Sequence, residues 1–226
     1  DLNFALNGLM GFDMNGKTAG VIGTGRIGRA VIKILHGFGM NILAVDRHKD
    51  EEFAKKYDVT FTDQDTLFAQ SDVITLHCPL TKETEYLINE ENINKMKEGV
   101  MLINTGRGKL INTQDLIEGL KSGKVGSAGL DVYEEESEYF FEDLSDRVMT
   151  DDVLARILTF NNVIVTSHQG FFTKEALYKI SETTLENIQG FARGDELLEN
   201  EICYRCKHYP GNCKKQKGEP CFEENK

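Results

Sequence analysis

A short glycine-rich segment constrains the fold of this chain more than any other feature. Gly23, Gly25 and Gly28 form the pattern G-x-G-x-x-G, at the end of the apolar run from Thr18 to Gly23. A helical pattern follows, with apolar residues three and four positions apart: Ile27, Val31, Ile34, Leu35 and Phe38. Such a turn brings backbone amides and the positive end of a helix dipole to a pyrophosphate. The segment predicts a dinucleotide-binding turn, with Arg26 and Ile27 among its cofactor contacts; a glycine turn without a ligand is the alternative.

An acidic residue follows the glycine segment at the expected distance. Asp46 ends a second predicted strand, Asn41 to Asp46, in the window about 20 residues beyond the last glycine. A carboxylate here accepts hydrogen bonds from the adenosine ribose and repels a 2′-phosphate, which favours NAD over NADP. The adjacent Arg47 and His48 could accommodate that phosphate, so the preference stays open.

Predicted strands and helices alternate along most of the chain. Further strands are expected at 72–78, 100–104, 126–132 and 162–167, and further helices at 64–70, 90–97, 113–122, 151–158 and 173–193. Several strands are apolar nearly throughout, which is typical of strands buried on both faces of a parallel sheet. The pattern predicts an α/β fold, a Rossmann-type doubly wound parallel sheet. Residues 134–152 are expected to form a long acidic loop.

Composition excludes several classes of function. Of the 226 residues, 40% are hydrophobic, enough for a packed core. The net charge of −11 repels phosphate backbones and argues against general nucleic-acid binding. No apolar run reaches the roughly 18 residues of a membrane span. The start, DLNFALNGLM, has neither an initiating Met nor the pattern of a signal peptide, so we expect a processed chain or a fragment, in a reducing cytoplasm.

Three polar residues follow predicted strands and form a candidate catalytic set. Arg107 follows VMLIN, Glu136 follows GSAGLDV and His168 follows NVIVTS. The carboxyl ends of parallel strands share one edge of a sheet, where ligands bind. Arginine offers a fork for a substrate carboxylate, histidine can exchange a proton with a carbonyl oxygen, and a carboxylate can orient that histidine.

Each of the three residues also has a plain structural interpretation. Arg107 could pair with surface acids, and His168 could be bonded to backbone at a strand end. Glu136 stands among other glutamates, and such a run is usually a solvated face. Their joint position at strand ends, downstream of a dinucleotide motif, favours the catalytic interpretation.

Five segments together carry a resemblance to a known family: GKTAGVIGTGRIG, SDVITLHCPLTKET, MKEGVMLINTGRG, GLDVYEEE and SHQGFFTKEAL. In this order, from about Gly16 to Ala176, they resemble the NAD-dependent D-2-hydroxyacid dehydrogenases, most closely the fermentative D-lactate dehydrogenase branch. The resemblance implies an oxidoreductase in which NADH reversibly reduces pyruvate to D-lactate. A larger 2-keto acid as substrate, or an NAD(H)-sensing protein on the same fold, are the alternatives.

The resemblance also implies roles for single residues. Arg107 would bind the substrate carboxylate, and His168 would be the acid and base with Glu136 as its partner. Phe171 would pack near the substrate methyl, although core packing is the alternative for Phe171 and Phe172. Asp131 would contact the nicotinamide carboxamide. The other implied cofactor contacts are Cys78, Pro79, Thr84, Thr105 and Gly106.

Members of this family have a substrate domain split between both chain ends, and the resemblance implies that only a remnant stands here. We expect an interdomain helix or hinge remnant at 1–15 and the NAD-binding domain at 16–188. A return to the substrate domain would follow at 189–200, and a Cys-rich tail at 201–226. The family usually forms homodimers through the cofactor domain, for which the loop GLMGFDMNGK could serve.

The tail contains four of the five cysteines: Cys203, Cys206, Cys213 and Cys221. Four thiolates in a short basic stretch could bind Zn²⁺ or an iron–sulfur cluster. A flexible tail with free thiols is the alternative.

Overall fold

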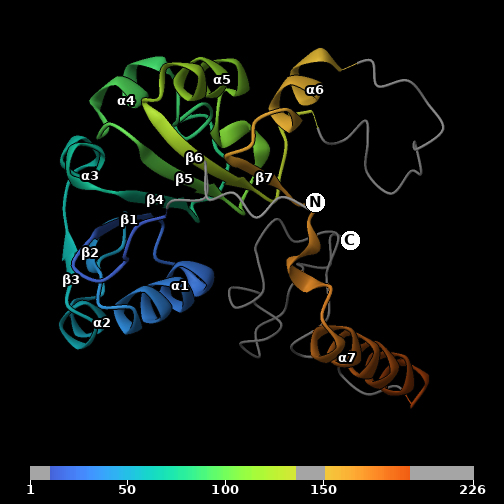
Figure 1. Cartoon of the computed structure of the whole chain (residues 1–226). Coiled ribbons are helices and arrows are strands. Elements are labelled where there is room, and N and C mark those ends of the chain that lie inside the picture. Colours follow the sequence, from blue (N-terminus) through green and yellow to red (C-terminus); the bar gives the residue numbers. More distant parts are fainter. Residues whose placement is uncertain (1–10, 136–150, 194–226) are drawn as a thin grey trace, which may run out of the picture. The chain divides into compact units, whose positions relative to one another are not determined.

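A seven-stranded parallel sheet forms the centre of the first of two units of the chain (Figure 1). The computed structural model describes residues 11–135 and 151–193, and its two units are Asp1–Gln169 and Gly170–Lys226. The strand order is β3-β2-β1-β4-β5-β6-β7, and every pair of neighbours is parallel. This order confirms the predicted doubly wound Rossmann-type sheet.

The bounds of most elements lie close to those predicted from the sequence. The strands are β1 (Thr18–Ile22), β2 (Asn41–Val45), β3 (Val59–Phe61), β4 (Val73–Leu76), β5 (Val100–Asn104), β6 (Val125–Leu130) and β7 (Val163–Val165). The helices of this unit are α1 (Arg26–Gly37), α2 (Glu51–Lys56), α3 (Gln64–Gln70), α4 (Glu90–Lys95), α5 (Thr113–Ser122) and α6 (Asp152–Leu158). The second unit contains α7 (Lys174–Arg193).

The helix α2 and the strand β3 were not predicted. β3 has three residues, and α2 has six, of which only Ala54 is buried. Segments this short carry too few apolar residues for a period to be recognised. The signal that was present is Asp50, whose side chain accepts a hydrogen bond from the amide of Phe53 and caps α2.

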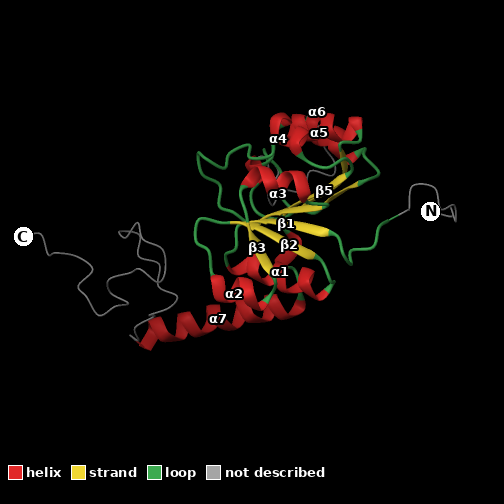
Figure 2. Ribbon diagram, turned by 90° about the vertical axis from the view of Figure 1, so that its left-hand side faces the viewer, coloured by secondary structure: helices red, strands yellow, loops and turns green. Residues whose placement is uncertain are grey.

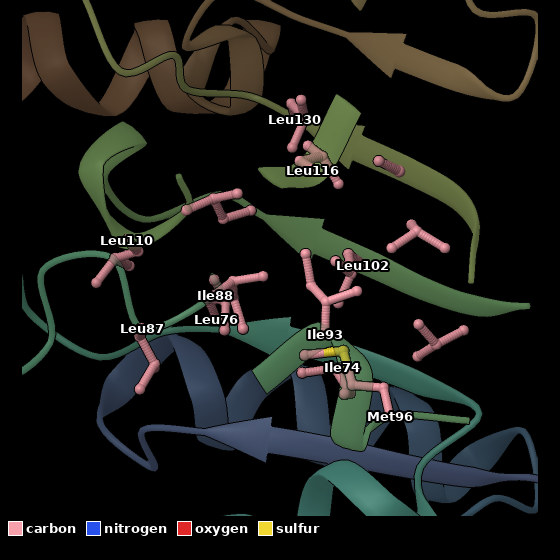
Figure 3. Packing of buried hydrophobic residues seen from close by; sticks show 14 of the residues in the cluster. Ile74, Leu76, Leu87, Ile88, Ile93, Met96, Leu102, Leu110, Leu116 and Leu130 are labelled. Atoms are coloured by element: carbon pink, nitrogen blue, oxygen red, sulfur yellow. The ribbon is translucent and has the colours of Figure 1, made fainter. Parts of the chain in front are cut away.

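Helices cover both faces of the sheet, α3 to α6 on one and α1 and α2 on the other (Figure 2), and an apolar core lies beneath each set. The larger core packs α3, α4, α5 and α6 against β1, β4, β5 and β6, and Figure 3 shows part of it around Ile74, Leu76 and Leu102. The smaller core packs α1 and α2 against β1, β2, β3 and the first residue of β4, Val73. β1 and β4 contribute to both cores, which explains why these strands are apolar nearly throughout.

The apolar residues of α1 do not all face the core. Gly28, Ile32 and Leu35 are buried, whereas Ile27 is 63% and Ile34 is 59% exposed. The pattern after the glycine turn thus predicted the helix correctly. It did not distinguish the apolar residues that face the core from those that face solvent.

In the second unit, α7 confirms the predicted long helix. It also carries exposed apolar side chains: Leu177, Tyr178, Ile180, Leu185, Ile188 and Phe191. Within the described ranges, no helix is both long and apolar enough to cross a membrane.

Candidate dinucleotide and substrate site

The last residues of six neighbouring strands are paired with one another, so these strands end together at one edge of the sheet. From β2 to β7 the paired residues are Val45, Ile22, Leu76, Asn104, Leu130 and Val165. The residues that follow them are Asp46, Gly23, His77, Thr105, Asp131 and Thr166. Strand spacings of about 4.8 Å place Asp46 and Asp131 roughly 19 Å apart along this edge. The edge includes the β1–β4 switch point, where open α/β sheets bind ligands.

The three glycines of the turn meet three different requirements. Gly23 has a φ of +96°, and a Cβ on it would lie 2.6 Å from the backbone nitrogen of Cys78. A Cβ on Gly28 would overlap the carbonyl oxygen of Gly23. Gly25 differs, because a Cβ there would meet no atom within 4 Å. The space above Gly25 is therefore open to a ligand, as a pyrophosphate requires.

The N-terminus of α1 supports the same interpretation. Gly25 is its N-cap and supplies no side-chain hydrogen bond, and no acidic residue stands in the first turn. The helices α2 to α6 are each capped by an Asp or Asn side chain: Asp50, Asp63, Asn89, Asn112 and Asp151. The first-turn amides of α1 thus lack a side-chain acceptor and suit an anion.

The carboxylate of Asp46 is fixed against the glycine turn. Its Oδ2 accepts hydrogen bonds from the backbone nitrogen (2.5 Å) and the hydroxyl (2.9 Å) of Thr24, and its Oδ1 accepts one from the amide of His48. Burial raises the pKa of Asp46, but these hydrogen bonds outweigh burial and lower the net pKa below 3.8. A charged, fixed carboxylate suits the recognition of ribose hydroxyls. Arg47 is exposed and lies 3.8 Å from Glu83.

The segment after β4 lies beneath the glycine turn. His77, which sequence reasoning did not single out, is half-buried, and its Nε2 lies 2.9 Å from the hydroxyl of Thr75. Burial lowers the pKa of His77 and raises the pKa of the Cys78 thiol, so both are held neutral. The Thr84 hydroxyl donates to the Pro79 carbonyl at 2.7 Å. Both residues are predicted cofactor contacts, and in the structure this hydrogen bond stabilises the loop that contains them.

The turn after β5 carries Arg107 on a buried support. Asn104 is 1% exposed; its Oδ1 accepts from the amide of Gly106 (3.0 Å), and its Nδ2 donates to the Arg107 carbonyl (2.9 Å). Arg107 itself is exposed, and its Nη1 donates to the carbonyl of Gly106. A Cβ on Gly108 would overlap the Tyr133 carbonyl, so this turn packs directly on the segment after β6.

Asp131 ties the end of β6 to the turn after β7. Its Oδ1 accepts hydrogen bonds from the Thr166 hydroxyl (2.5 Å) and the Gln169 amide (3.0 Å). Its carbonyl accepts one from the amide of His168 at 2.9 Å. His168 has a φ of +48°, an uncommon conformation for a residue with a Cβ. The predicted contact of Asp131 with nicotinamide stays a prediction.

Glu134 is not a solvated member of the acidic run. Its Oε1 accepts a hydrogen bond from the Tyr86 hydroxyl (2.6 Å), and its Oε2 accepts one from the Thr113 amide at the start of α5 (3.2 Å). The hydrogen bond to Glu134 raises the pKa of Tyr86 to about 12. Glu134 thus joins three loops, a role that its place in a glutamate run concealed.

Some predicted residues cannot be placed in this site. Glu136, most of the predicted acidic loop and the four tail cysteines lie outside the described residues. Phe171 belongs to the second unit, is 49% exposed and lies edge-on to Phe172. The part of the chain that is described holds no cluster of three His, Cys, Asp or Glu side chains suited to a metal. The roles of Glu136 and Phe171, the metal site and the predicted domain boundaries stay predictions.

Known proteins resemble this chain over most of its length. D-lactate dehydrogenase of Escherichia coli is 52% identical over 202 residues, which cover 89% of this chain and 61% of that protein. The pyruvate reductase of Chlamydomonas reinhardtii superposes with a TM-score of 0.81 at 40% identity, covering 87% of this chain and 60% of that one. D-lactate dehydrogenase of Aquifex aeolicus, solved with NAD and lactic acid, superposes with a TM-score of 0.75 at 40% sequence identity. The match covers 86% of this chain and 59% of that chain.

The match is confined to one part of these relatives. The chain spans about 60% of the length of the relatives it matches. Residues 3–170 match the family model of the D-isomer specific 2-hydroxyacid dehydrogenase, NAD binding domain. The predicted family and the predicted NAD-binding fold are thereby confirmed. The chain belongs to the D-isomer specific 2-hydroxyacid dehydrogenases and contains their NAD-binding domain.

Proposed function

We propose that this chain is the NAD-binding part of a D-lactate dehydrogenase, which reduces pyruvate to D-lactate with NADH and catalyses the reverse reaction. The observation that carries the proposal is the Asp131-held turn that presents His168 at the sheet edge shared with Arg107. The relatives named D-lactate dehydrogenase support the choice of substrate. Because the chain spans about 60% of those relatives, turnover is expected to require a substrate domain as well.

Three residues of the chain have separate roles in the proposed reaction. NADH, when bound, supplies a hydride to C2 of the keto acid. The guanidinium of Arg107 pairs with the substrate carboxylate through two parallel hydrogen bonds and so fixes the orientation of C2. The imidazolium of His168 donates its proton to the C2 oxygen, and the neutral ring takes it back from the hydroxyl in the reverse direction. The role of partner to His168 is assigned to Glu136, as the resemblance to the family implies.

Selection of NAD is assigned to the glycine turn and the carboxylate beside it. The open space over Gly25 and the first-turn amides of α1 would hold the pyrophosphate. The carboxylate of Asp46 would accept from the ribose hydroxyls and repel a 2′-phosphate. Arg47 and Glu83 form an exposed ion pair at 3.8 Å, and this carboxylate places a second negative charge beside the arginine.

The exposed apolar row of α1 also supports a homodimer. Ile27, Ile34 and Phe38 follow one face of the helix and are 63%, 59% and 53% exposed. Exposed apolar side chains that gather on one face of a helix are a candidate contact surface. We expect sedimentation velocity to find a dimer that Ile34→Glu dissociates; a monomer at every concentration contradicts this assembly.

Binding and turnover test the function separately. Nicotinamide fluorescence measures NADH affinity in the 226-residue chain. Turnover is measured in that chain and in a chimera. The chimera is the D-lactate dehydrogenase of Escherichia coli in which the NAD-binding domain is replaced by residues 3–170 of this chain. We expect NADH binding in both and pyruvate reduction in the chimera. A substrate series up to phenylpyruvate tests the acid, and a preference for the larger keto acids would contradict D-lactate dehydrogenase.

A further inference from the structure

Asn104 is the most completely buried polar side chain near the candidate substrate site. It ends β5 between Leu76 of β4 and Leu130 of β6, and it is 1% exposed. A buried amide is costly unless its donor and acceptor are both used. Both are used here, and both partners belong to the turn that carries Arg107.

The two hydrogen bonds of Asn104 hold the backbone on either side of the Arg107 Cα. Oδ1 accepts from the amide of Gly106, before the arginine, and Nδ2 donates to the carbonyl of Arg107 itself. The Arg107 carbonyl also accepts from the amide of Leu110 at 3.1 Å. The backbone carbonyl of Asn104 accepts from the amide of Asp131, which joins this turn to the segment that holds His168.

We propose that Asn104 is a positioning residue for the substrate carboxylate, acting through Arg107. This inference rests on the proposed function of Arg107. An arginine on a loose turn must be ordered when substrate binds, and that cost weakens binding and misaligns C2. A buried amide that fixes the turn in advance removes this cost, while the guanidinium stays exposed for the ligand.

Two substitutions separate positioning from bulk packing. Asn104→Ala removes both hydrogen bonds. Asn104→Asp keeps the size and the acceptor for Gly106 but sets an oxygen against the carbonyl of Arg107. Asn162→Ala is the matched control, because Asn162 also donates its side-chain amide to a backbone carbonyl, that of Gly126, at 2.8 Å.

The expected result is a split between the two ligands. In the 226-residue chain, Asn104→Ala accelerates hydrogen exchange at residues 105–108, and the NADH dissociation constant rises less than the KM for pyruvate, because most of the predicted cofactor contacts lie outside this turn. In the chimera, the KM for pyruvate rises about tenfold or more for Asn104→Ala and Asn104→Asp, and kcat falls less. In a chain that already carries Arg107→Lys, Asn104→Ala should change the KM less than it does alone, because both substitutions weaken the same interaction with the substrate carboxylate.

The outcomes distinguish this inference from the proposed function. A chimera that reduces pyruvate normally with Asn104→Ala overturns the inference and leaves the proposed function standing. Full additivity of Asn104→Ala with Arg107→Lys, or an equal loss of NADH and pyruvate binding, also overturns it, because these indicate a general structural role. A parent chimera that binds NADH but neither reduces pyruvate nor binds its isostere oxamate contradicts both.

Discussion

The backbone carbonyl of Asp131 accepts a hydrogen bond of 2.9 Å from the amide of His168, whose φ of +48° lies in the left-handed region. The side chain of Asp131 holds the same turn through Thr166 and Gln169. An uncommon backbone conformation persists only where surrounding contacts enforce it, and such residues concentrate at functional sites. The orientation of the proposed proton donor is therefore set from the end of β6, the neighbouring strand.

Removing the carboxylate of Asp131 should loosen this turn. We expect Asp131→Ala to lower the free energy of unfolding by about 1–3 kcal/mol, because two hydrogen bonds are lost, and Thr166→Val by about 0.5–1.5 kcal/mol. In the chimera, displacement of His168 should lower kcat for pyruvate up to about 100-fold in Asp131→Ala. Urea unfolding and steady-state kinetics measure the two effects.

Thr159→Val is the control for loss of a hydroxyl, since Thr159, the exposed C-cap residue of α6, donates to the carbonyl of Arg156 in the same helix. If Thr159→Val reduced turnover as much as Thr166→Val, the turn after β7 would have no special role.

Two glycines of the same motif should respond differently to alanine. Gly25→Ala adds a methyl group to open space at a φ of −70°, so the chain should fold with unchanged stability. The methyl group would occupy the pyrophosphate position, and NADH affinity should fall about tenfold or more. Gly28→Ala forces overlap with the Gly23 carbonyl and should cost about 1–3 kcal/mol of stability. Thermal unfolding and NADH fluorescence separate the two; unaltered NADH binding by Gly25→Ala would refute the proposed pyrophosphate position.

The lowered pKa of Asp46 makes its contribution to stability depend on pH. The folded-state pKa lies below 3.8, so the stabilisation is present above pH 3.8 and is lost as the pH falls through the folded-state value. The difference in unfolding free energy between the parent chain and Asp46→Asn should therefore be constant from pH 7 to about 5 and shrink below pH 3.8. Asp63→Asn is the matched control, because Asp63 caps α3 and its pKa is also lowered by a backbone hydrogen bond. This variant should show the same dependence of stability on pH, with no change in NADH affinity. A difference that grows toward low pH would contradict this assignment.

The sequence allowed the sheet and the glycine turn to be predicted closely. The glycines constrain the backbone by direct steric exclusion at Gly23 and Gly28, and Asp46 follows a strand at a fixed distance. Such local requirements leave a recognisable pattern. The alternation of apolar strands and helices sufficed for the fold class, because each strand from β1 to β6 is followed in the chain by a helix of the same unit.

The positioning contacts could not be predicted, because they join distant parts of the chain. Glu134 contacts Tyr86, 48 residues away, and Asp131 contacts Thr166, 35 residues away. The side-chain bonds of Asn104 are local, but only its burial makes them decisive. An acidic run or an Asn before a Thr-Gly pair carries no signal of these partners. The exposed row on α1 was also hidden, because a helical period does not distinguish an apolar surface from a core.

The role of His168 is tested by pyruvate-dependent oxidation of NADH by the chimera and its His168→Ala variant. The control is His36→Ala, which changes an exposed histidine paired with Asp58. We expect turnover by the parent and by His36→Ala, and a loss of about 1,000-fold or more in His168→Ala with unchanged NADH affinity. If His168→Ala kept the rate of the parent, His168 would not be the proton donor, and the proposed mechanism would be wrong.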